Sequence, residues 1–365
     1  YRVETLTNAA GEVTSFSYDV ANRRTTVTDP LQLRTIYAYD AGGQLLSVTA
    51  PAVDGVSQVT SYAYDAAGNL TAVTDPAGRT VAMGYDAHGN LTTQRDAAGN
   101  TVTRTYDAHN QLATETVYAV PDSDGAGPAQ PGAPATSRFV YDAAGRNQLR
   151  FAISATGDVT EYRYDAQGNQ IETLQYGYAP FGVNALGATA VPSESDMEYW
   201  AREQDPSRTG HVARTFDFRG QVTQERSFAV ADENGNVDAL PVTVHYVYDS
   251  AGRLLNSIAA NGGITSYTYD GLGRVQTATD AANAITVNRY DDVNRRSSVT
   301  IASGLVTTST YDAAGRLLTV VQGSDAGGQL GETRYRYDAD GRLLMSTDPT
   351  GVSRWSLYDD AGRKV

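Results

Sequence analysis

The sequence lacks cysteine and has almost no lysine. Its 365 residues include 28 Lys and Arg residues together, of which Lys364 is the single lysine. The absence of cysteine excludes disulfides, thiolate metal sites and a cysteine nucleophile. One lysine near the end of the chain leaves no Walker loop for phosphates and argues against a Schiff-base lysine.

Positive charge is also scarce relative to negative charge. The 42 Asp and Glu residues give a formal net charge of −14 at pH 7. This balance argues against a general nucleic-acid binder and against a binder of anionic membranes, because both need excess positive charge. The sequence has no apolar run of about 18 residues and no recognisable signal peptide, so it predicts no membrane span.

What the sequence has instead is a short repeat. Tyr-Asp occurs thirteen times, and Phe216-Asp217 is a conservative fourteenth copy. Seven of the intervals between copies are 21 residues long, and the others read as this period plus insertions. Repetition at a fixed period predicts one repeat architecture rather than two or three unrelated domains. The tyrosines are Tyr18, Tyr39, Tyr64, Tyr85, Tyr106, Tyr141, Tyr164, Tyr248, Tyr269, Tyr290, Tyr311, Tyr337 and Tyr358.

Each repeat carries the chemistry of a tight turn. Four residues after the aromatic stands Gly in eleven copies and Asn in three, followed always by Arg, Asn or Gln. Asp65 to Gly68 has Asp at the first and Gly at the fourth position, as in a type I turn. Gly or Asn at the fourth position indicates a left-handed residue, because these types adopt positive φ most easily. We therefore predict a hairpin loop with a bulge.

A second turn of the same kind completes the period. Asp75-Pro76-Ala77-Gly78 separates two Thr- and Val-rich segments, 69–74 and 79–85, which are typical of strands. Each period is thus predicted to contain two strands and two tight turns, and consecutive periods to form an antiparallel meander. Equivalent tyrosines would lie two strands apart, roughly 9.6 Å, so the intervening strand must supply their partners.

Fourteen periods imply about 28 strands, and open twisted sheets rarely exceed about ten without curling, splitting or flattening. The alternate face is rich in Thr and Ser, for example at Thr101, Thr103 and Thr105, and is poor material for a sandwich core. We therefore predict an all-β fold in which the meander curls into a spiral or hollow wall.

The repeat is predicted to run through residues 1–365 as a single continuous array, interrupted near 121–134, 176–214, 231–241 and 323–332. The first, third and fourth interruptions read as loops with Gly or Pro. In the longest one, Ser195-Asp196-Met197-Glu198 predicts a helix start of the capping-box type. We expect one short helix that ends near Asp205-Pro206 with Trp200 against the sheet, and this stretch could include one degenerate repeat.

No constellation of catalytic residues stands out. The four histidines, His88, His109, His211 and His245, have no partners at metal-ligand spacing, and two of them occupy turn positions. Neither His-Glu-x-x-His nor Gly-x-Ser-x-Gly occurs, and the repeated Asp residues already have a turn role. The sequence therefore predicts no catalytic, cofactor-binding or metal-ligating residues, no cofactor, and a protein that is not an enzyme.

Two features leave alternatives open. The acidic segments 122–125 and 232–238 either are solvated turns or bind calcium, although neither completes a twelve-residue calcium loop. The arginines that follow the repeat glycine would form a row along one edge of the wall. That row either pairs with the repeat Asp residues or binds anions or glycans. The row consists of Arg253, Arg274, Arg295, Arg316 and Arg342.

The unit Tyr-Asp-Ala-Ala-Gly-Arg-Leu-Leu at 311–318, like Tyr-Asp-Ala-Ala-Gly-Asn-Leu at 64–70, resembles the YD repeat of the Rhs family. This family includes the bacterial Rhs polymorphic toxins, the shell components of Tc toxin complexes and the teneurins. The resemblance covers essentially the whole chain and implies a β-sheet that spirals into a hollow shell. In the toxin members that shell encloses a C-terminal effector. They usually end the array with a Pro- and Asp-containing motif and an aspartic autoprotease, neither of which is recognisable here.

The leading hypothesis is a structural segment of a shell that encapsulates a C-terminal toxin or other cargo in a large secreted bacterial protein. Its expected partners are the enclosed effector domain or components of a secretion system. The alternative is a surface-exposed stalk that binds carbohydrate or another cell. Both readings place the protein outside the bacterial cell or on its surface. The chain begins and ends inside a repeat unit, so we expect it to be a segment of a longer protein.

Overall fold

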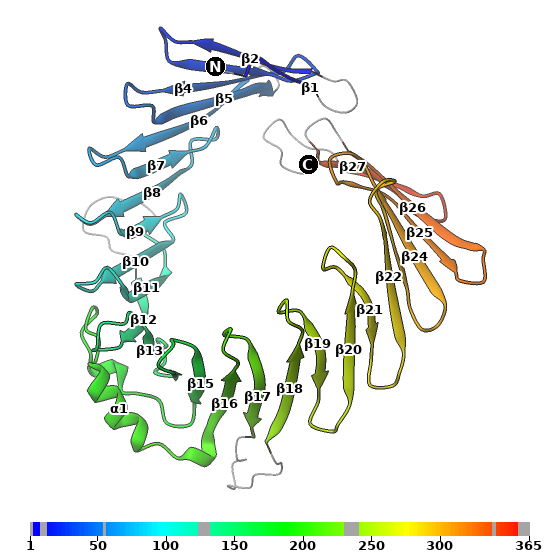
Figure 1. The fold of residues 1–365 in the computed structure, drawn as a ribbon. Coiled ribbons are helices and arrows are strands. Elements are labelled where there is room, and N and C mark those ends of the chain that lie inside the picture. Colours follow the sequence, from blue (N-terminus) through cyan, green and yellow to red (C-terminus); the bar gives the residue numbers. More distant parts are fainter. Residues whose placement is uncertain are drawn as a thin grey trace. The chain divides into compact units, whose positions relative to one another are not determined.

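The computed structural model describes residues 3–7, 13–53, 56–122, 132–229, 241–337 and 341–356. These residues are almost entirely strands and tight turns, with one α-helix and two short 3-10 helices (Figure 1). The chain divides into two compact units. The first unit comprises residues 1–62, 249–256 and 263–365, and the second comprises 63–248 and 257–262.

Consecutive strands pair in an antiparallel manner within each unit, as the repeat predicts. The strands before the helical insertion are β1 (Thr5–Thr7), β2 (Val13–Asp19), β3 (Arg24–Thr28), β4 (Arg34–Tyr39), β5 (Leu45–Val53), β6 (Val56–Tyr64), β7 (Leu70–Thr74), β8 (Thr80–Tyr85), β9 (Leu91–Arg95), β10 (Thr101–Tyr106), β11 (Leu112–Val120), β12 (Gly132–Tyr141), β13 (Leu149–Ile153), β14 (Val159–Tyr164) and β15 (Gln170–Tyr176). Those after it are β16 (Thr209–Phe216), β17 (Val222–Phe228), β18 (Val242–Tyr248), β19 (Leu254–Ile258), β20 (Ile264–Tyr269), β21 (Val275–Thr279), β22 (Ile285–Asp291), β23 (Arg296–Thr300), β24 (Leu305–Tyr311), β25 (Leu317–Ser324), β26 (Gln329–Tyr337), β27 (Leu343–Thr347) and β28 (Ser353–Trp355).

The turn after each Tyr-Asp pair has the predicted construction. At 65–69, the Gly68 N–H donates to the carbonyl of Asp65, and the Asp65 N–H donates to the carbonyl of Asn69. Oδ1 of Asp65 accepts from the backbone N–H groups of Ala67 and Asn69, each at 2.9 Å. Gly68 has φ 91°, in the left-handed region where a side chain would be strained. The second turn, Asp75 to Gly78, repeats this pattern.

Two copies depart from the predicted left-handed position. In the repeats with Asn22 and Asn294, the positive φ falls one residue later, on Arg23 at 51° and on Arg295 at 50°. The Asn side chain instead donates to the repeat aspartate, for example from Nδ2 of Asn22 to Oδ2 of Asp19 at 2.7 Å. The prediction that the Asn four residues after the aromatic is left-handed is therefore wrong for these two copies. It is right for Asn110, with φ 61°.

The longest interruption forms a helical insertion and contains no hidden repeat. Tyr176 at the end of β15 pairs directly with Thr209 at the start of β16. Between them lie the 3-10 helix η1 (Val183–Ala185), the helix α1 (Glu194–Arg202) and the 3-10 helix η2 (Pro206–Arg208). The capping box is real, but its cap is Ser193 with Asp196 rather than the predicted Ser195. Ser193 takes the cap because its side chain accepts from the Asp196 N–H and the Asp196 carboxylate accepts from the Ser193 N–H.

The apolar core is local and lies beneath this insertion. Met197 of α1 and Phe151 of β13 are fully buried, and Trp200 packs edge-on against Tyr176 with ring centroids 5.3 Å apart. The predicted anchoring of Trp200 against the sheet is thus present. The buried cluster consists of Val140, Phe151, Ile153, Val159, Tyr176 and Met197. Outside it, the described strands bury few apolar side chains, so turns and strand ladders stabilise most of the array.

Insertions dock on a glycine of the preceding second turn. The N–H of Asp122 donates to the carbonyl of Gly99, that of Phe181 to Gly157, and that of Asp325 to Gly304. A Cβ added to Gly99 or Gly157 would collide with the backbone of the docked segment, and one added to Gly304 would crowd the Asp325 carboxylate. Glycine at these turns therefore serves two purposes. It adopts a positive φ, and it lets the backbone of the docked segment approach the turn closely.

Two of the predicted loops, near 121–134 and 231–241, lie largely outside the described residues. The third, near 323–332, lies within described strands and their turn. Residues 123–131 and 230–240 are not described, and Gly132 to Pro134 already belong to β12. At 323–332 the strands β25 and β26 extend and join by a turn at 325–328, so this interruption is a longer hairpin rather than a loop.

Candidate functional site

The repeat tyrosines form clips between neighbouring strands. Tyr106, at the end of β10, donates from its hydroxyl to the carbonyl of Leu91 in β9 at 2.9 Å. The regular pairing of β10 with β9 ends before this point, at Thr103 opposite Thr93. The side chain therefore continues the contact between strands where the register stops. The same bond is made by Tyr18, Tyr106, Tyr141, Tyr164, Tyr248, Tyr269, Tyr290 and Tyr337.

Three arginines of the row, Arg253, Arg274 and Arg316, pair with the repeat aspartates. Nε of Arg253 donates to Oδ2 of Asp249 at 2.7 Å, and its guanidinium lies 4.9 Å from the ring centroid of Tyr269 in the next repeat. Arg274 and Arg316 repeat both contacts. Of the two alternatives that the sequence leaves open, these arginines follow the one in which they pair with the repeat aspartates. Each also makes a cation–π contact with the tyrosine of the following repeat. Arg295 departs from this pattern because it occupies the left-handed turn position.

Asparagine replaces arginine along part of the second unit. Nδ2 of Asn90 donates to Oδ2 of Asp86 at 2.9 Å and to Oδ1 of Asn110 at 3.1 Å, in the next repeat. Oδ1 of Asn69 lies within 3.6 Å of where a Cβ of Gly89 would be. The side chain of the residue after the glycine thus extends toward the next repeat, whether that residue is arginine or asparagine.

These contacts lower the pKa values of the repeat carboxyls. The side-chain amide of Asn69 is the main cause that lowers the pKa of Asp65 below its usual value, and the backbone N–H of Asn69 adds to it. At Asp270 the backbone N–H of Arg274 is the main cause that lowers the pKa, and the guanidinium of Arg274 contributes further. Two hydrogen-bonded charged partners, Asp292 and Asp270, raise the pKa of Arg274. The aspartates are therefore held as carboxylates by the turn that they stabilise.

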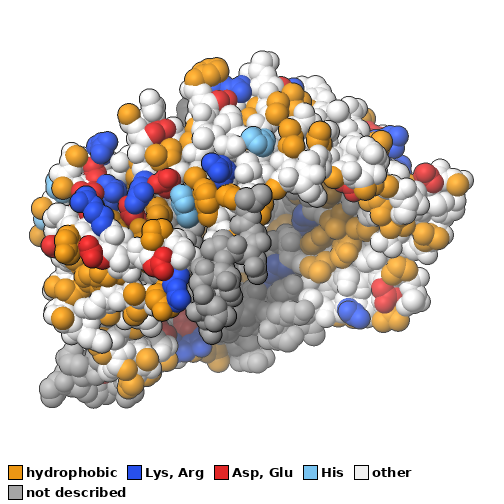
Figure 2. Space-filling model, turned by 90° about the horizontal axis from the view of Figure 1, so that it is seen from below, with side chains coloured by type: hydrophobic (Ala, Val, Ile, Leu, Met, Phe, Trp, Pro, Cys, Tyr) orange, Lys and Arg blue, Asp and Glu red, His pale blue; other side chains and the backbone are white. Residues whose placement is uncertain are grey.

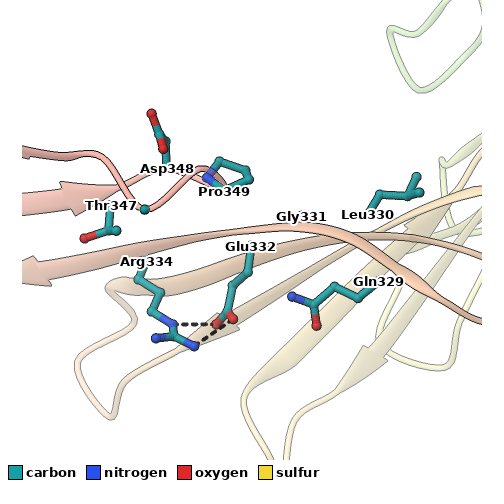
Figure 3. A pocket seen from close by; sticks show the side chains of 9 residues that line it. Gln329, Leu330, Gly331, Glu332, Arg334, Thr347, Asp348 and Pro349 are labelled. Carbon is teal, nitrogen blue, oxygen red and sulfur yellow. Dashed lines mark hydrogen bonds and ion pairs between the residues drawn. The ribbon is translucent and has the colours of Figure 1, made fainter.

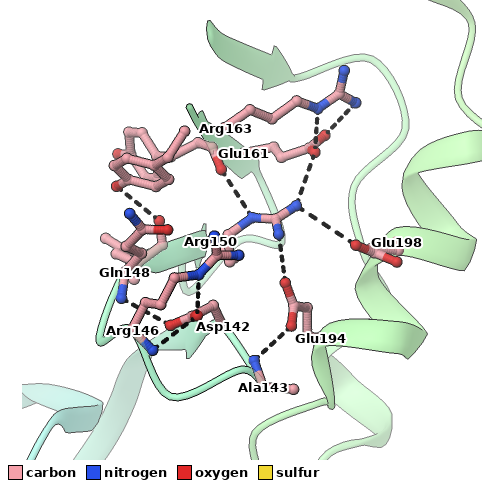
Figure 4. A network of polar contacts seen from close by, with 12 residues as sticks. Asp142, Ala143, Arg146, Gln148, Arg150, Glu161, Arg163, Glu194 and Glu198 are labelled. Carbon is pink, nitrogen blue, oxygen red and sulfur yellow. Dashed lines mark hydrogen bonds and ion pairs between the residues drawn. The ribbon is translucent and has the colours of Figure 1, made fainter. Parts of the chain in front are cut away.

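A cluster of charged side chains fixes α1 to the sheet (Figure 4). Nη1 of Arg150 lies 2.5 Å from Oε1 of Glu194, and the same guanidinium is 3.6 Å from Glu198 and 3.8 Å from Glu161. Glu161 is only 3% exposed, and its carboxylate also accepts from Arg163 at 2.6 Å and from Tyr176 at 2.7 Å. Burial raises the pKa of the Tyr176 hydroxyl, and its bond to Glu161 adds to the shift. Glu161, Glu194 and Glu198 each form an ion pair with an arginine, so the cluster suits docking rather than proton transfer.

The sequence did not single out this cluster. Its one visible signal was charged residues at strand positions, such as Arg150 beside Phe151 and Glu161 two residues after Val159. Which charges meet depends on strand register and on where the insertion returns to the sheet, and neither follows from local pattern.

The four histidines are separate. His88 and His109 lie in turns whose backbone N–H groups donate to Asp86 and Asp107. The ring of His211 stacks on Phe228 with centroids 4.5 Å apart, and His245 lies beside Gln224. Among the described residues no group of three or more His, Cys, Asp or Glu side chains is arranged to hold a metal ion. Of the acidic segments, 232–238 lies outside the described residues, as do all but Asp122 of 122–125.

The described surface has shallow cavities and mixed charge. One cavity of about 420 Å³ in the first unit lies between β26 and the turn after β27, with Arg334 paired to Glu332 at 2.9 Å (Figure 3). The Arg334 guanidinium lowers the pKa of Glu332. On the face seen in Figure 2, acidic and basic side chains are intermingled rather than gathered by sign. No helix within the described ranges has the length and apolar character needed to cross a bilayer.

Family models match most of the sequence. The RHS Repeat model matches residues 2–32, 248–285 and 290–325, and the Teneurin YD-shell model matches residues 34–179. The chain belongs to the Rhs/YD-repeat family. The repeat turns, tyrosine clips and arginine ladder described above are therefore features of a YD-repeat chain. No curated protein matches this YD-repeat chain in a search by sequence.

Solved structures confirm the predicted shell-type fold of this YD-repeat chain. The crystal structure of TcdB2-TccC3 without its hypervariable C-terminal region matches with a TM-score of 0.61 at 14% identity, covering 100% of this chain and 21% of that one. The structure of TcdB2-TccC3-TEV matches with a TM-score of 0.55 at 14% identity, covering 100% and 19%. The YD-repeat chain thus spans about a fifth of the length of these structures.

Proposed function

We propose that this chain is a non-enzymatic segment of the wall of a β-shell that encloses a polypeptide cargo, such as a C-terminal toxin. The shell would belong to a large bacterial protein that is secreted or displayed at the cell surface. Its partners would be the enclosed effector and components of a delivery system. Membership of the Rhs/YD-repeat family and the likeness of its fold to a Tc toxin structure support this proposal.

One observation carries the structural part of the proposal. The polar groups of the repeat motif are used in bonds within and between neighbouring repeats. The carboxylate of Asp270, for example, accepts from the backbone N–H groups of Leu272 and Arg274 and from Nε of Arg274. Groups so engaged are not free to bind or transform a substrate, but they hold a long sheet in register.

Limited proteolysis of the native polypeptide that contains this chain tests the proposal. Segments enclosed by the wall should resist a protease that digests them rapidly once the wall is loosened. Asp270→Ala should loosen it by removing the acceptor of one turn. Leu272→Ala is the matched control, because Leu272 lies in the same turn and is 74% exposed.

Enclosure predicts protection in the parent protein and in the Leu272→Ala variant, with faster digestion in the Asp270→Ala variant. Equal digestion of all three proteins, at the rate of the unenclosed segments, would contradict it. Adhesion predicts a different result, namely saturable binding of the chain to intact cells that survives loosening of the wall.

A further inference from the structure

A cavity of about 360 Å³ in the second unit lies between the threonine-rich face of β10 to β12 and the first part of the helical insertion. Its volume falls in the range of small-molecule sites, about 300–1,000 Å³. The sheet contributes Thr103, Thr105, Thr136 and Arg138, and the insertion contributes Asn184 and Ala188. The sheet side of the cavity is therefore polar and carries a positive charge, and Val183 and Leu186 make part of the insertion side apolar.

The charge belongs to Arg138, which is only 4% exposed. Nε of Arg138 donates to the carbonyl of Ala190 at 2.9 Å, Nη1 to that of Thr136 at 3.0 Å, and Nη2 to that of Gly187 at 3.3 Å. A guanidinium has five N–H groups, so these three bonds leave one on each terminal nitrogen. Burial lowers the pKa of Arg138, as expected for a desolvated cation.

Arg138 differs from the other buried charges of this unit. Glu161 and Asp142 are also buried, and each is paired with an arginine. Arg138 has no ion pair with an Asp or Glu of the described chain; its partners are neutral carbonyls. A buried charge without a counter-charge is costly, and an anionic group in the adjoining cavity would offset that cost.

The rest of the wall presents hydroxyls in pairs. Thr105 and Thr114 lie 2.7 Å apart, Thr116 and Thr136 lie 2.8 Å apart, and Thr103 lies 3.3 Å from the hydroxyl of Tyr118. Within such a pair only one hydrogen is shared, so each pair keeps a donor and several acceptor lone pairs for a third group. This is the complement of a polyhydroxylated ligand.

We propose that this cavity binds an acidic monosaccharide of the hexuronate class, with its carboxylate at Arg138 and its hydroxyls at the threonine pairs. The site does not depend on what the shell encloses, so it stands apart from the proposed wall function. It also does not involve the arginine row, in which Arg253, Arg274 and Arg316 already pair with the repeat aspartates.

Calorimetric titration of the full 365-residue chain with sodium glucuronate, glucose and acetate tests the site. Titration at about 0.15 M salt limits long-range repulsion by the net negative charge. Glucuronate should bind about tenfold or more tightly than glucose, which lacks the carboxylate, and than acetate, which lacks the hydroxyls. Equal binding of acetate and glucuronate would overturn the assignment to a sugar, and the absence of glucuronate binding would overturn the site.

Two variants locate the binding without altering Arg138. Ala188→Phe places a large ring in the cavity and should abolish glucuronate binding. Ala185→Phe adds the same ring to the same insertion outside the cavity lining and should bind like the parent chain. Arg138→Gln should remove the preference for glucuronate over glucose. Should that variant fail to fold, the two alanine variants still decide, because unchanged binding in Ala188→Phe would refute the site.

Discussion

The hydroxyl of Tyr269 donates a 2.7 Å hydrogen bond to the carbonyl of Leu254, fifteen residues earlier. The ring of the same tyrosine lies under the guanidinium of Arg253, the residue just before Leu254. One side chain thus connects two repeats through its polar end and through its aromatic face. Removing the hydroxyl alone separates the two contributions, because phenylalanine keeps the ring.

Tyr269→Phe should lower the free energy of unfolding by about 1 kcal/mol, since one hydrogen bond is lost and a carbonyl loses its donor. The measurement is urea unfolding followed by circular dichroism. Tyr267→Phe, on the same strand, is the control and should change the free energy by less than about 0.5 kcal/mol. Equal losses in both variants would show that the hydroxyl of Tyr269 has no special role.

Gly157→Ala should destabilise the second unit more than Gly262→Ala destabilises the chain. Both glycines have positive φ, 94° and 80°, so both substitutions carry the cost of a left-handed alanine, about 1 kcal/mol. Only at Gly157 would the new Cβ collide with the carbonyl of Phe181. The difference between the unfolding midpoints of the two variants measures the cost of the collision with Phe181. Indistinguishable midpoints would argue against that collision.

Met197→Ala should release α1 from the sheet. Met197 is fully buried, so its truncation should cost about 2–4 kcal/mol. Tyr199, two residues along the same helix, is 70% exposed, and Tyr199→Ala should be nearly neutral. Fluorescence of Trp200, which packs on Tyr176, reports the docking directly. A parent-like emission spectrum in Met197→Ala would contradict the assigned core.

The array should lose stability in acid. The repeat aspartates have lowered pKa values in the folded chain, among them Asp65, Asp249 and Asp312. A folded pKa below the unfolded value near 3.9 gives stability that is present above about pH 4 and lost as pH falls through the folded pKa. Urea midpoints measured from pH 7 downward should therefore fall below about pH 4.

A substitution that keeps the turn but removes its titration sharpens this expectation. Asp65→Asn retains an oxygen that can accept from the Ala67 and Asn69 N–H groups while losing the charge. The variant should be less stable than the parent at pH 7, and its midpoint should depend less on pH. A midpoint in the parent chain that stays constant to pH 3 would contradict the role of the ionised turns.

The turn chemistry could be predicted from the sequence because it is local. Asp65 and Gly68 lie three residues apart, and their requirements for hydrogen bonding and for positive φ can be read from residue type alone. Asn22 shows the limit of this reasoning. Its side chain has a competing bond to Asp19, and the left-handed conformation passes to Arg23, which no local preference favours.

The helical insertion and its cavity could not be predicted to the same degree. The sequence predicts the helix start two residues too late because Ser193 and Ser195 both precede acidic residues, and the extended backbone of Ser193 makes it the cap. The contacts of Arg138 with Gly187 and Ala190 join residues about fifty positions apart. Such contacts depend on how the insertion returns over the sheet, which periodicity does not contain.

The tyrosine clips couple most repeats only to the repeat before them. An array held by such bonds behaves as a one-dimensional chain of nearest neighbours, in which total stability is close to the sum of unit and interface contributions. A damaged turn then weakens two seams and leaves distant repeats unaffected. By the same logic, whole periods can be gained or lost during evolution without redesign of the rest, so the length of such an array can change in steps of one period.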